Sequence, residues 1–119
     1  FGKSTLDFQG LEWKLADVAT DLEAARRLTY HAVEVMDAGA DGVVEAAHAK
    51  KFATRVAFAG IAECMQAMGA AGLHQDHALA RHLACAKAAQ YMDGATEIQN
   101  VVLGRHLRSH YGTPAAPDA

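Results

Sequence analysis

The chain has 119 residues, and 51% of them are hydrophobic, which suffices for one folded domain and excludes a wholly disordered chain. Its net charge is −3 and its pI about 6.1, so it lacks the basic character of a nucleic-acid-binding domain. The two cysteines, Cys64 and Cys85, are too few for a disulfide scaffold and are expected to be reduced thiols.

The sequence also carries no sign of a membrane or secretory segment. No run approaches about 18 consecutive apolar residues, so we expect no transmembrane span, and no signal peptide is visible. Together with the few cysteines, these features predict a cytoplasmic protein. Because residue 1 is Phe1 rather than Met, we expect the chain to be a segment of a longer or processed polypeptide.

The first half of the chain predicts two helices. Apolar residues recur there at three- and four-residue spacing, which predicts a helix over residues 5–36. This apolar stripe comprises Leu11, Leu15, Val18, Leu22, Ala25, Leu28 and Val33. Residues 37–42 read as a break in which Gly39 is a C-terminal cap candidate. A second, alanine-rich helix is expected over residues 44–68, followed by a loop over residues 69–77.

The second half predicts two shorter helices. One covers residues 79–91 and ends at the Asp93-Gly94 break, and the other starts with Thr96 as a cap and ends near residue 109 or 110. The Pro-containing stretch 113–119 is expected to be a disordered tail. Strand-type alternation is absent, so we predict an all-α domain over residues 1–112, built as an antiparallel four-helix bundle.

Several pairs of side chains have metal-ligand or nucleophile character, but each is incomplete. A di-iron bundle needs two Glu-x-x-His motifs, and a zinc site needs further ligands at recognisable spacing. The pairs are Glu45 with His48, His74 with His77 near His82, and His106 with His110. We therefore favour surface histidines over a metal site, and a packed thiol over a nucleophile at Cys64.

Two further features allow both a structural and a functional interpretation. Phe8 and Trp13 could stack on a ring-shaped ligand, but such aromatics are more often part of a core. Asp93 and Gly94 precede a helix N-terminus, where glycine permits close approach and free N–H groups favour anions. Asp-Gly is also a common turn dipeptide, and taken alone the local sequence favours the turn.

Three separated stretches, taken together, resemble the acyl-CoA dehydrogenase family. Residues 1–9 and 14–17, Phe-Gly-Lys-Ser-Thr-Leu-Asp-Phe-Gln and Lys-Leu-Ala-Asp, resemble the start of its C-terminal helical domain. Residues 65–73, Met-Gln-Ala-Met-Gly-Ala-Ala-Gly-Leu, resemble its glycine-rich flavin loop. Residues 91–99, Tyr-Met-Asp-Gly-Ala-Thr-Glu-Ile-Gln, resemble its catalytic segment. The order and spacing agree, and the resemblance covers residues 1–108.

The resemblance implies a C-terminal domain of an FAD enzyme that converts an acyl-CoA to an enoyl-CoA. It implies abstraction of the α-proton by an acidic side chain, with transfer of the β-hydride to FAD, and an electron-accepting flavoprotein as partner. It further implies a homotetramer or dimer of dimers, with the ADP half of FAD reaching a neighbouring subunit. Since the β-domain of the family lies outside these residues, we expect the segment alone to be inactive.

The resemblance also assigns roles to individual residues. Asp93 stands where the family has its catalytic Glu, and Gly94 leaves room for the thioester chain. The positions that match FAD contacts in the family are Gln9, Gln66, Gly69, Ala70, Ala95 and Glu97. No metal is implied.

The sequence departs from the family pattern at three of these positions. Asp93 is one methylene shorter than Glu, and a misplacement of about 1 Å can cost on the order of 100-fold in rate. Ala70 replaces a glycine in the flavin loop, and Ala95 replaces a threonine. These departures keep open an alternative: a non-catalytic assembly subunit of a heteromer, or a stand-alone helical interaction domain.

Overall fold

The computed structural model describes residues 2–112, which form four α-helices and no strand. From the N-terminus the helices are α1 (Gln9–Asp37), α2 (Val43–Met68), α3 (Leu79–Ala89) and α4 (Thr96–Tyr111). Short 3₁₀ turns are η1 (Thr5–Asp7) before α1, and η2 (Gly69–Leu73) and η3 (Gln75–His77) between α2 and α3. The all-α prediction is confirmed, whereas the tail expected to be disordered, residues 113–119, falls outside the described range.

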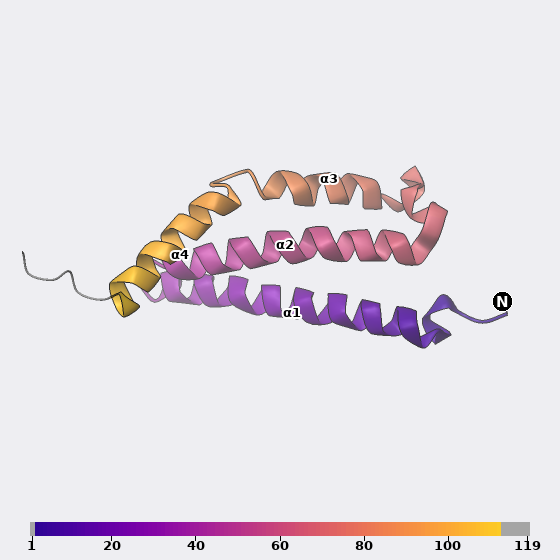
Figure 1. The fold of residues 1–119 in the computed structure, drawn as a ribbon, viewed down its shortest axis with the longest axis horizontal. Helices are drawn as coiled ribbons and strands as arrows, with labels where there is room; N and C mark the ends of the chain where they lie inside the picture. Colours follow the sequence, from indigo (N-terminus) through magenta and orange to yellow (C-terminus); the bar gives the residue numbers. More distant parts are fainter. Residues whose placement is uncertain (1, 113–119) are drawn as a thin grey trace, which may run out of the picture.

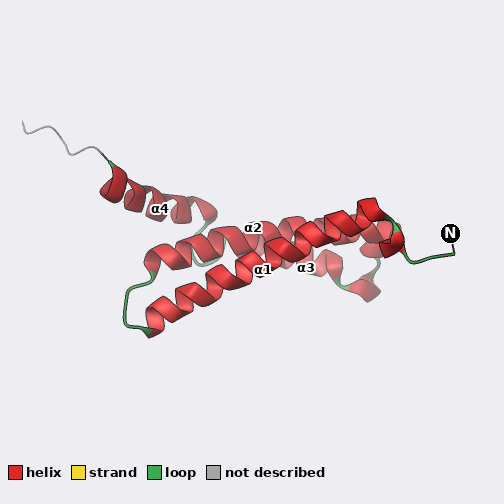
Figure 2. Cartoon of the chain, turned by 90° about the horizontal axis from the view of Figure 1, so that it is seen from below, coloured by secondary structure: helices red, strands yellow, loops and turns green. Residues whose placement is uncertain are grey.

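Helix α2 is the centre of the arrangement. Helices α1 and α3 run antiparallel to it, and α4 crosses its first half (Figure 1). Seen from below, α4 diverges from the other three helices (Figure 2). Within residues 2–112, the backbone of α2 lies close to each of the other helices, whereas the backbone of α1 lies close to neither α3 nor α4. The predicted four-helix bundle is therefore an open one, in which three helices are held by one.

The core is thin and made of small side chains. Of the seven buried apolar residues in the described part of the chain, six are Ala or Val and one is Leu. They are Ala25, Ala32, Ala47, Ala49, Val56, Ala86 and Leu103. Small side chains let helices approach closely, and a Cβ added at Gly60 of α2 would lie 3.0 Å from Val18 Cγ1 of α1. Close helix approach is therefore obtained with little burial of large apolar side chains.

The predicted apolar stripe of α1 is only partly buried. Leu22 and Val33 are each 45% exposed, whereas Ala32, which the stripe omitted, is 4% exposed. Trp13, expected to pack in a core, is 61% exposed. The reason is that α1 meets a single helix, so only a narrow face of it is covered. Three- and four-residue spacing marks a wider apolar face than one partner can cover.

Two helix starts differ from the prediction. Phe8 has extended backbone torsions, so the helix expected from residue 5 is divided into η1 and α1. A capping box between Ser4 and Asp7 fixes η1 as a separate turn. Thr96 does not cap α4: Ala95 holds the N-cap position without a side-chain hydrogen bond, and Thr96 is the first helical residue.

The end of α1 agrees with the sequence. Gly39 follows the cap residue Ala38 with a φ of +88°. The N–H of Gly39 donates to Met36 O at 2.9 Å, and that of Ala40 donates to Val35 O at 3.2 Å. This pair of bonds is the Schellman arrangement that a glycine in this position favours.

One segment, Val43–Leu73, is long and apolar enough in composition to cross a membrane. It contains α2, the helix that packs against all the others. Within the described residues, 17% of the most apolar 18-residue window of this segment is buried, so the other helices cover only a minority of it.

Candidate functional site

The turn between α3 and α4 presents the residues with the strongest functional signal. Asp93 and Gly94 both have positive φ, +50° and +92°. Asp is among the few non-glycine residues that adopt this left-handed conformation readily. The Asp93 side chain is exposed, and Gly94 is half-buried. The Asp93 carboxylate is therefore exposed at the turn, and the next residue, Gly94, has no side chain.

Hydrogen bonds hold this turn on both sides of Asp93. The Lys50 ammonium of α2 donates to Met92 O. The Gln99 side-chain amide of α4 donates to Gly94 O at 3.0 Å. The Thr96 N–H closes the turn by donating to Gln90 O at 3.2 Å. The carbonyls of the two residues next to Asp93, Met92 and Gly94, are therefore bonded to side chains of α2 and α4, which restrains the backbone from which its carboxylate projects.

The end of α3 is tied to α2 by a further polar contact. The Gln90 amide donates to Thr54 O at 3.3 Å, and the Lys87 ammonium donates to Gln90 Oε1 at 2.9 Å. Lys50, Gln90 and Gln99 had no assigned role in the sequence. Gln99 lies within the motif of residues 91–99, so its position carried a signal. Lys50 is 42 residues from Met92, and no local pattern connects the two.

The second group of predicted residues surrounds the bend after α2. Gln66, Gly69 and Ala70 line an open depression of about 470 Å³ together with apolar side chains of α2 and α3. Gly69 has a φ of +60°, and a Cβ built on it would meet no atom within 4 Å. Ala70 is exposed, so its methyl group leaves the backbone of the bend accessible.

These residues suit an FAD contact. The depression offers a side-chain amide, exposed backbone and apolar walls, and it has no acidic lining residue that would repel a pyrophosphate. Gly72 packs closely against the backbone of α2 at this bend, since a Cβ added there would lie 2.7 Å from Met65 O. No role was assigned to this glycine from the sequence, although it lies within the matching glycine-rich stretch of residues 65–73.

The structure separates the predicted cofactor residues into two groups. Gln9 opens α1 at the end of the molecule that also holds the α2–α3 connection (Figure 1). Its neighbour Gly10 and Gln66 line one shallow depression. Ala95 and Glu97 instead stand with Asp93 at the other end of α3. Eleven helical residues separate the groups by about 16 Å, so residues 69–70 and 95–97 do not form one local site.

The histidines and cysteines do not converge. Within residues 2–112, no three His, Cys, Asp or Glu side chains lie close enough to hold a metal ion. His106 and His110 have ring centroids 4.2 Å apart, and the His74 ring lies 3.2 Å from an Asp76 oxygen. Cys64 is half-buried and Cys85 is exposed.

One carboxylate outside both groups has a perturbed ionisation. Glu23 of α1 accepts a hydrogen bond from the Arg27 guanidinium at 2.8 Å and another from Arg26 at 2.6 Å. The Arg27 hydrogen bond is the main cause that holds the pKa of Glu23 below its usual 4.5. The Glu23 side chain is 44% exposed and both arginine side chains are more so, so the cluster marks a solvated face of α1 rather than a catalytic group.

Comparison with known proteins places these features in a family. The family described as acyl-CoA dehydrogenase, C-terminal domain, matches residues 1–108. The chain is 38% identical over 111 residues to the short/branched chain specific acyl-CoA dehydrogenase of Rattus norvegicus mitochondria, covering 93% of this chain and 26% of the rat protein.

Solved structures agree with this match. Butyryl-CoA dehydrogenase from Megasphaera elsdenii is 38% identical with a TM-score of 0.87. A chain in the electron transferring flavoprotein structure of Acidaminococcus fermentans is 36% identical, also with a TM-score of 0.87. Each match covers 90% of this chain and 28% of the other. The chain thus spans about a quarter of these proteins, and it belongs to the acyl-CoA dehydrogenase family as its C-terminal helical domain.

Proposed function

We propose that the flavoenzyme containing this chain oxidises an acyl-CoA to an enoyl-CoA, with Asp93 as the catalytic base. The observation that carries the proposal is the exposed Asp93 carboxylate on a turn clamped by Lys50 and Gln99. An α-C–H beside a thioester is a weak acid, and a positioned carboxylate can remove its proton. The α-proton goes to Asp93, the C–H electron pair becomes the new double bond, and the β-hydrogen leaves as hydride.

Neighbouring residues have supporting roles in this proposal. Gly94 presents no side chain, which leaves space for the thioester beside the carboxylate. Ala95 and Glu97 lie at the start of α4, where they would approach the flavin. A turn in which Asp93 is fixed before substrate binds lowers the cost of bringing base and proton together.

FAD is the implied cofactor, and when bound it supplies the acceptor for the hydride. Gln9, Gln66, Gly69 and Ala70 would contact an FAD molecule at the far end of α3. Their separation from Ala95 and Glu97 supports the expectation that the two groups serve FAD molecules of different subunits. This arrangement requires an oligomer, which we propose to be a homotetramer or dimer of dimers.

The exposed apolar surface supports such an assembly. Among residues 2–112, sixteen large apolar side chains are exposed, including Trp13, Tyr30 and Leu73, and exposed apolar surface is a feature of interfaces when it forms a patch. The segment alone is proposed to be inactive, because most of the relatives' length lies outside it. We also propose an electron-accepting flavoprotein as partner, a role in fatty acid metabolism and a cytoplasmic location.

The test is an anaerobic flavin spectrum of the complete flavoenzyme with a panel of acyl-CoA thioesters. We expect one thioester to bleach the flavin, and Asp93→Asn to slow that bleaching by about 10²–10⁴-fold, the usual contribution of a general base. Asn tolerates positive φ, so the turn is preserved. Asp37→Asn, at the exposed end of α1, is the matched control and should leave the rate unchanged.

The other outcomes are informative as well. Bleaching that persists unchanged in Asp93→Asn would remove Asp93 from the reaction. Purified protein without flavin would favour the alternative, a non-catalytic assembly subunit. This alternative is tested because residue 93 is Asp, whereas the family has Glu at the matching position.

A further inference from the structure

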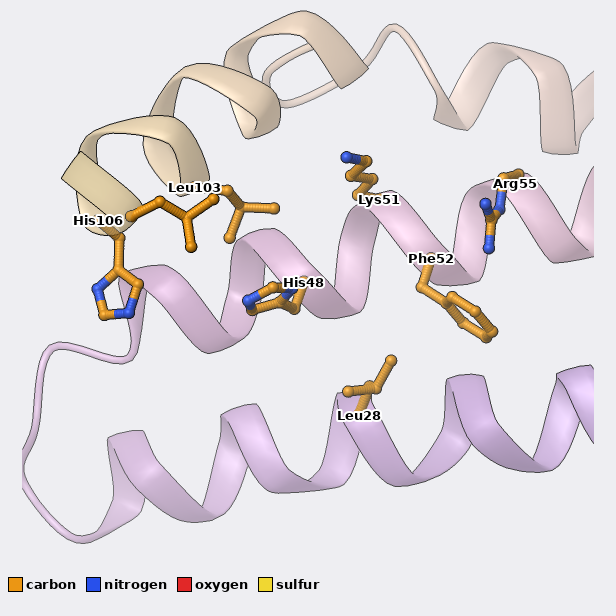
Figure 3. Close-up of a pocket in the computed structure, with 8 residues that line it drawn as sticks. Leu28, His48, Lys51, Phe52, Arg55, Leu103 and His106 are labelled. Atoms are coloured by element: carbon orange, nitrogen blue, oxygen red, sulfur yellow. The ribbon is translucent and has the colours of Figure 1, made fainter. Parts of the chain in front are cut away.

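A pocket of about 340 Å³ lies between α1, α2 and α4, away from the residues assigned to flavin or acyl-CoA. Figure 3 shows side chains from three helices around it, including Leu28 of α1, Phe52 of α2 and Leu103 of α4. Its volume falls at the small end of the range of about 300–1,000 Å³ for small-molecule sites. No residue of the Asp93 turn or of the η2 bend lines it.

The pocket has two kinds of lining. Leu28, Phe52, Leu103 and Leu107 form its apolar walls. All its polar lining residues are basic, namely His48, Lys51, Arg55 and His106. The chain carries a net charge of −3, yet no acidic residue lines this pocket. The local charge is therefore opposite in sign to that of the whole chain.

The basic side chains are arranged by helical spacing. His48, Lys51 and Arg55 lie at positions i, i+3 and i+7 of α2, so they share one face. The Arg55 guanidinium carbon lies 5.1 Å from the Phe52 ring centroid, a cation–π contact that restrains it. Lys50, the adjacent lysine, is bonded to Met92 O instead. The cations at the pocket are thus distinct from the one that holds the Asp93 turn.

The pocket and the proposed chemical site have no lining residue in common. His106 lies ten residues beyond Thr96 on α4, a rise of about 15 Å along the helix axis. No residue of the Asp93 turn lines the pocket, although Lys51 in its wall follows Lys50, which bonds to Met92 O of that turn. An occupant held by these side chains would therefore be a second ligand, apart from the acyl group that reacts at Asp93.

We propose that this pocket binds a small organic anion with an apolar body. The Leu and Phe side chains bury the apolar part, and Lys51 and Arg55 pair with a carboxylate, sulfonate or phosphate group. Charge complementarity decides the class of ligand, because apolar walls alone would accept a neutral molecule equally well. The proposal does not depend on the assignment of Asp93.

Isothermal titration calorimetry of the complete flavoenzyme tests it with two matched probes. The first is 8-anilinonaphthalene-1-sulfonate, and the second is N-phenyl-1-naphthylamine, which has the same rings without the anion. We expect the sulfonate to bind more tightly than the amine without altering flavin absorbance. An altered flavin spectrum on binding would place the probe at the substrate site and overturn the proposal.

Substitutions of lining residues test whether the sulfonate probe binds in this pocket. Lys51→Gln with Arg55→Gln should weaken the sulfonate about tenfold or more, since hydrogen bonds to charged groups contribute that much, and should leave the amine unchanged. Leu107→Asp, at an exposed position of the rim, should weaken both probes. Lys3→Gln with Lys14→Gln removes the same charge near the start of α1 and should change neither affinity. Equal sulfonate binding in the first variant and the parent would overturn the proposal.

Discussion

The molecule has two sharp bends that carry its candidate site residues, and they are held by different means. The turn at Asp93 is held by polar side chains from other elements, Lys50 of α2 and Gln99 of α4. The bend after α2 is held by close backbone packing, with Gly72 directly against Met65. A proposed catalytic group is thus placed by polar contacts, one of them between residues 42 apart, and a proposed cofactor surface by local steric fit.

This difference has a physical basis. A base must be placed accurately relative to its proton, and the hydrogen bonds to Met92 O and Gly94 O restrain the backbone that carries the Asp93 carboxylate. A cofactor surface needs accessible backbone, and small residues expose it. The two bends should therefore respond differently to substitution. Changes at the Asp93 turn should mainly lower turnover, and changes at the bend after α2 should mainly lower stability.

The largest effect on stability is expected at Gly72. In Gly72→Ala the new Cβ would lie 2.7 Å from Met65 O and 2.9 Å from Met65 Cα, so the backbone must shift. We expect the free energy of unfolding to fall by about 3 kcal/mol, the upper range for overpacking. Urea unfolding of the chain measures it, with the slope unchanged so that the midpoint reports stability.

Gly69→Ala is the matched control for the same bend. Its Cβ would meet no atom within 4 Å, but its φ of +60° strains any side chain. The expected loss is only about 1 kcal/mol. If Gly69→Ala destabilised the chain more than Gly72→Ala, backbone conformation rather than close packing would determine the bend.

The next largest effect is expected on the rate of flavin reduction, when Lys50 is substituted. Lys50→Met keeps the length of the side chain and removes its bond to Met92 O. With one flanking carbonyl released, the Asp93 carboxylate samples more positions. We expect the rate of flavin reduction in the complete flavoenzyme to fall about tenfold, less than the ~100-fold that a fixed 1 Å displacement can cost.

Single-turnover flavin reduction at saturating thioester isolates this step from substrate binding. Arg26→Met, which also removes one cation from an exposed helix face, is the control and should leave the rate unchanged. A Lys50→Met enzyme with the parent rate would show that Gln99 and the backbone suffice to hold the turn.

The comparison also explains what could be read from the sequence. Helix positions followed from residue spacing and from Gly39, because helix formation and termination are local. The position of the Asp93 turn followed from its motif. Lys50 could not be identified as its partner, because pairing between residues 42 apart depends on how α2 and α3 pack.

Burial was harder to predict than helix position. Leu22, Val33 and Trp13 were assigned to a covered face but are exposed. Spacing identifies an apolar face, but not whether this chain or another covers it. Likewise, the basic lining shared by Lys51 and His106 joins α2 to α4 and appears only once the two helices are packed.

The smallest effect concerns Glu23, whose pKa is lowered chiefly by its hydrogen bond to Arg27. Because the folded-state pKa is below the usual 4.5, the ion pair stabilises the fold above that pH. The contribution is lost as the pH falls through the lowered pKa. Exposure keeps it small, and added salt should weaken it further.

Carboxyl NMR titration measures this pKa directly. Arg27→Gln should raise it more than Arg26→Gln does, although Arg26 makes the shorter contact, 2.6 Å against 2.8 Å. The reason is that Arg27 contributes both the leading hydrogen bond and the larger charge effect. If Arg26→Gln produced the larger rise, the shorter contact would be the dominant one. In both variants turnover should stay at the parent value, since this face of α1 lies apart from both bends.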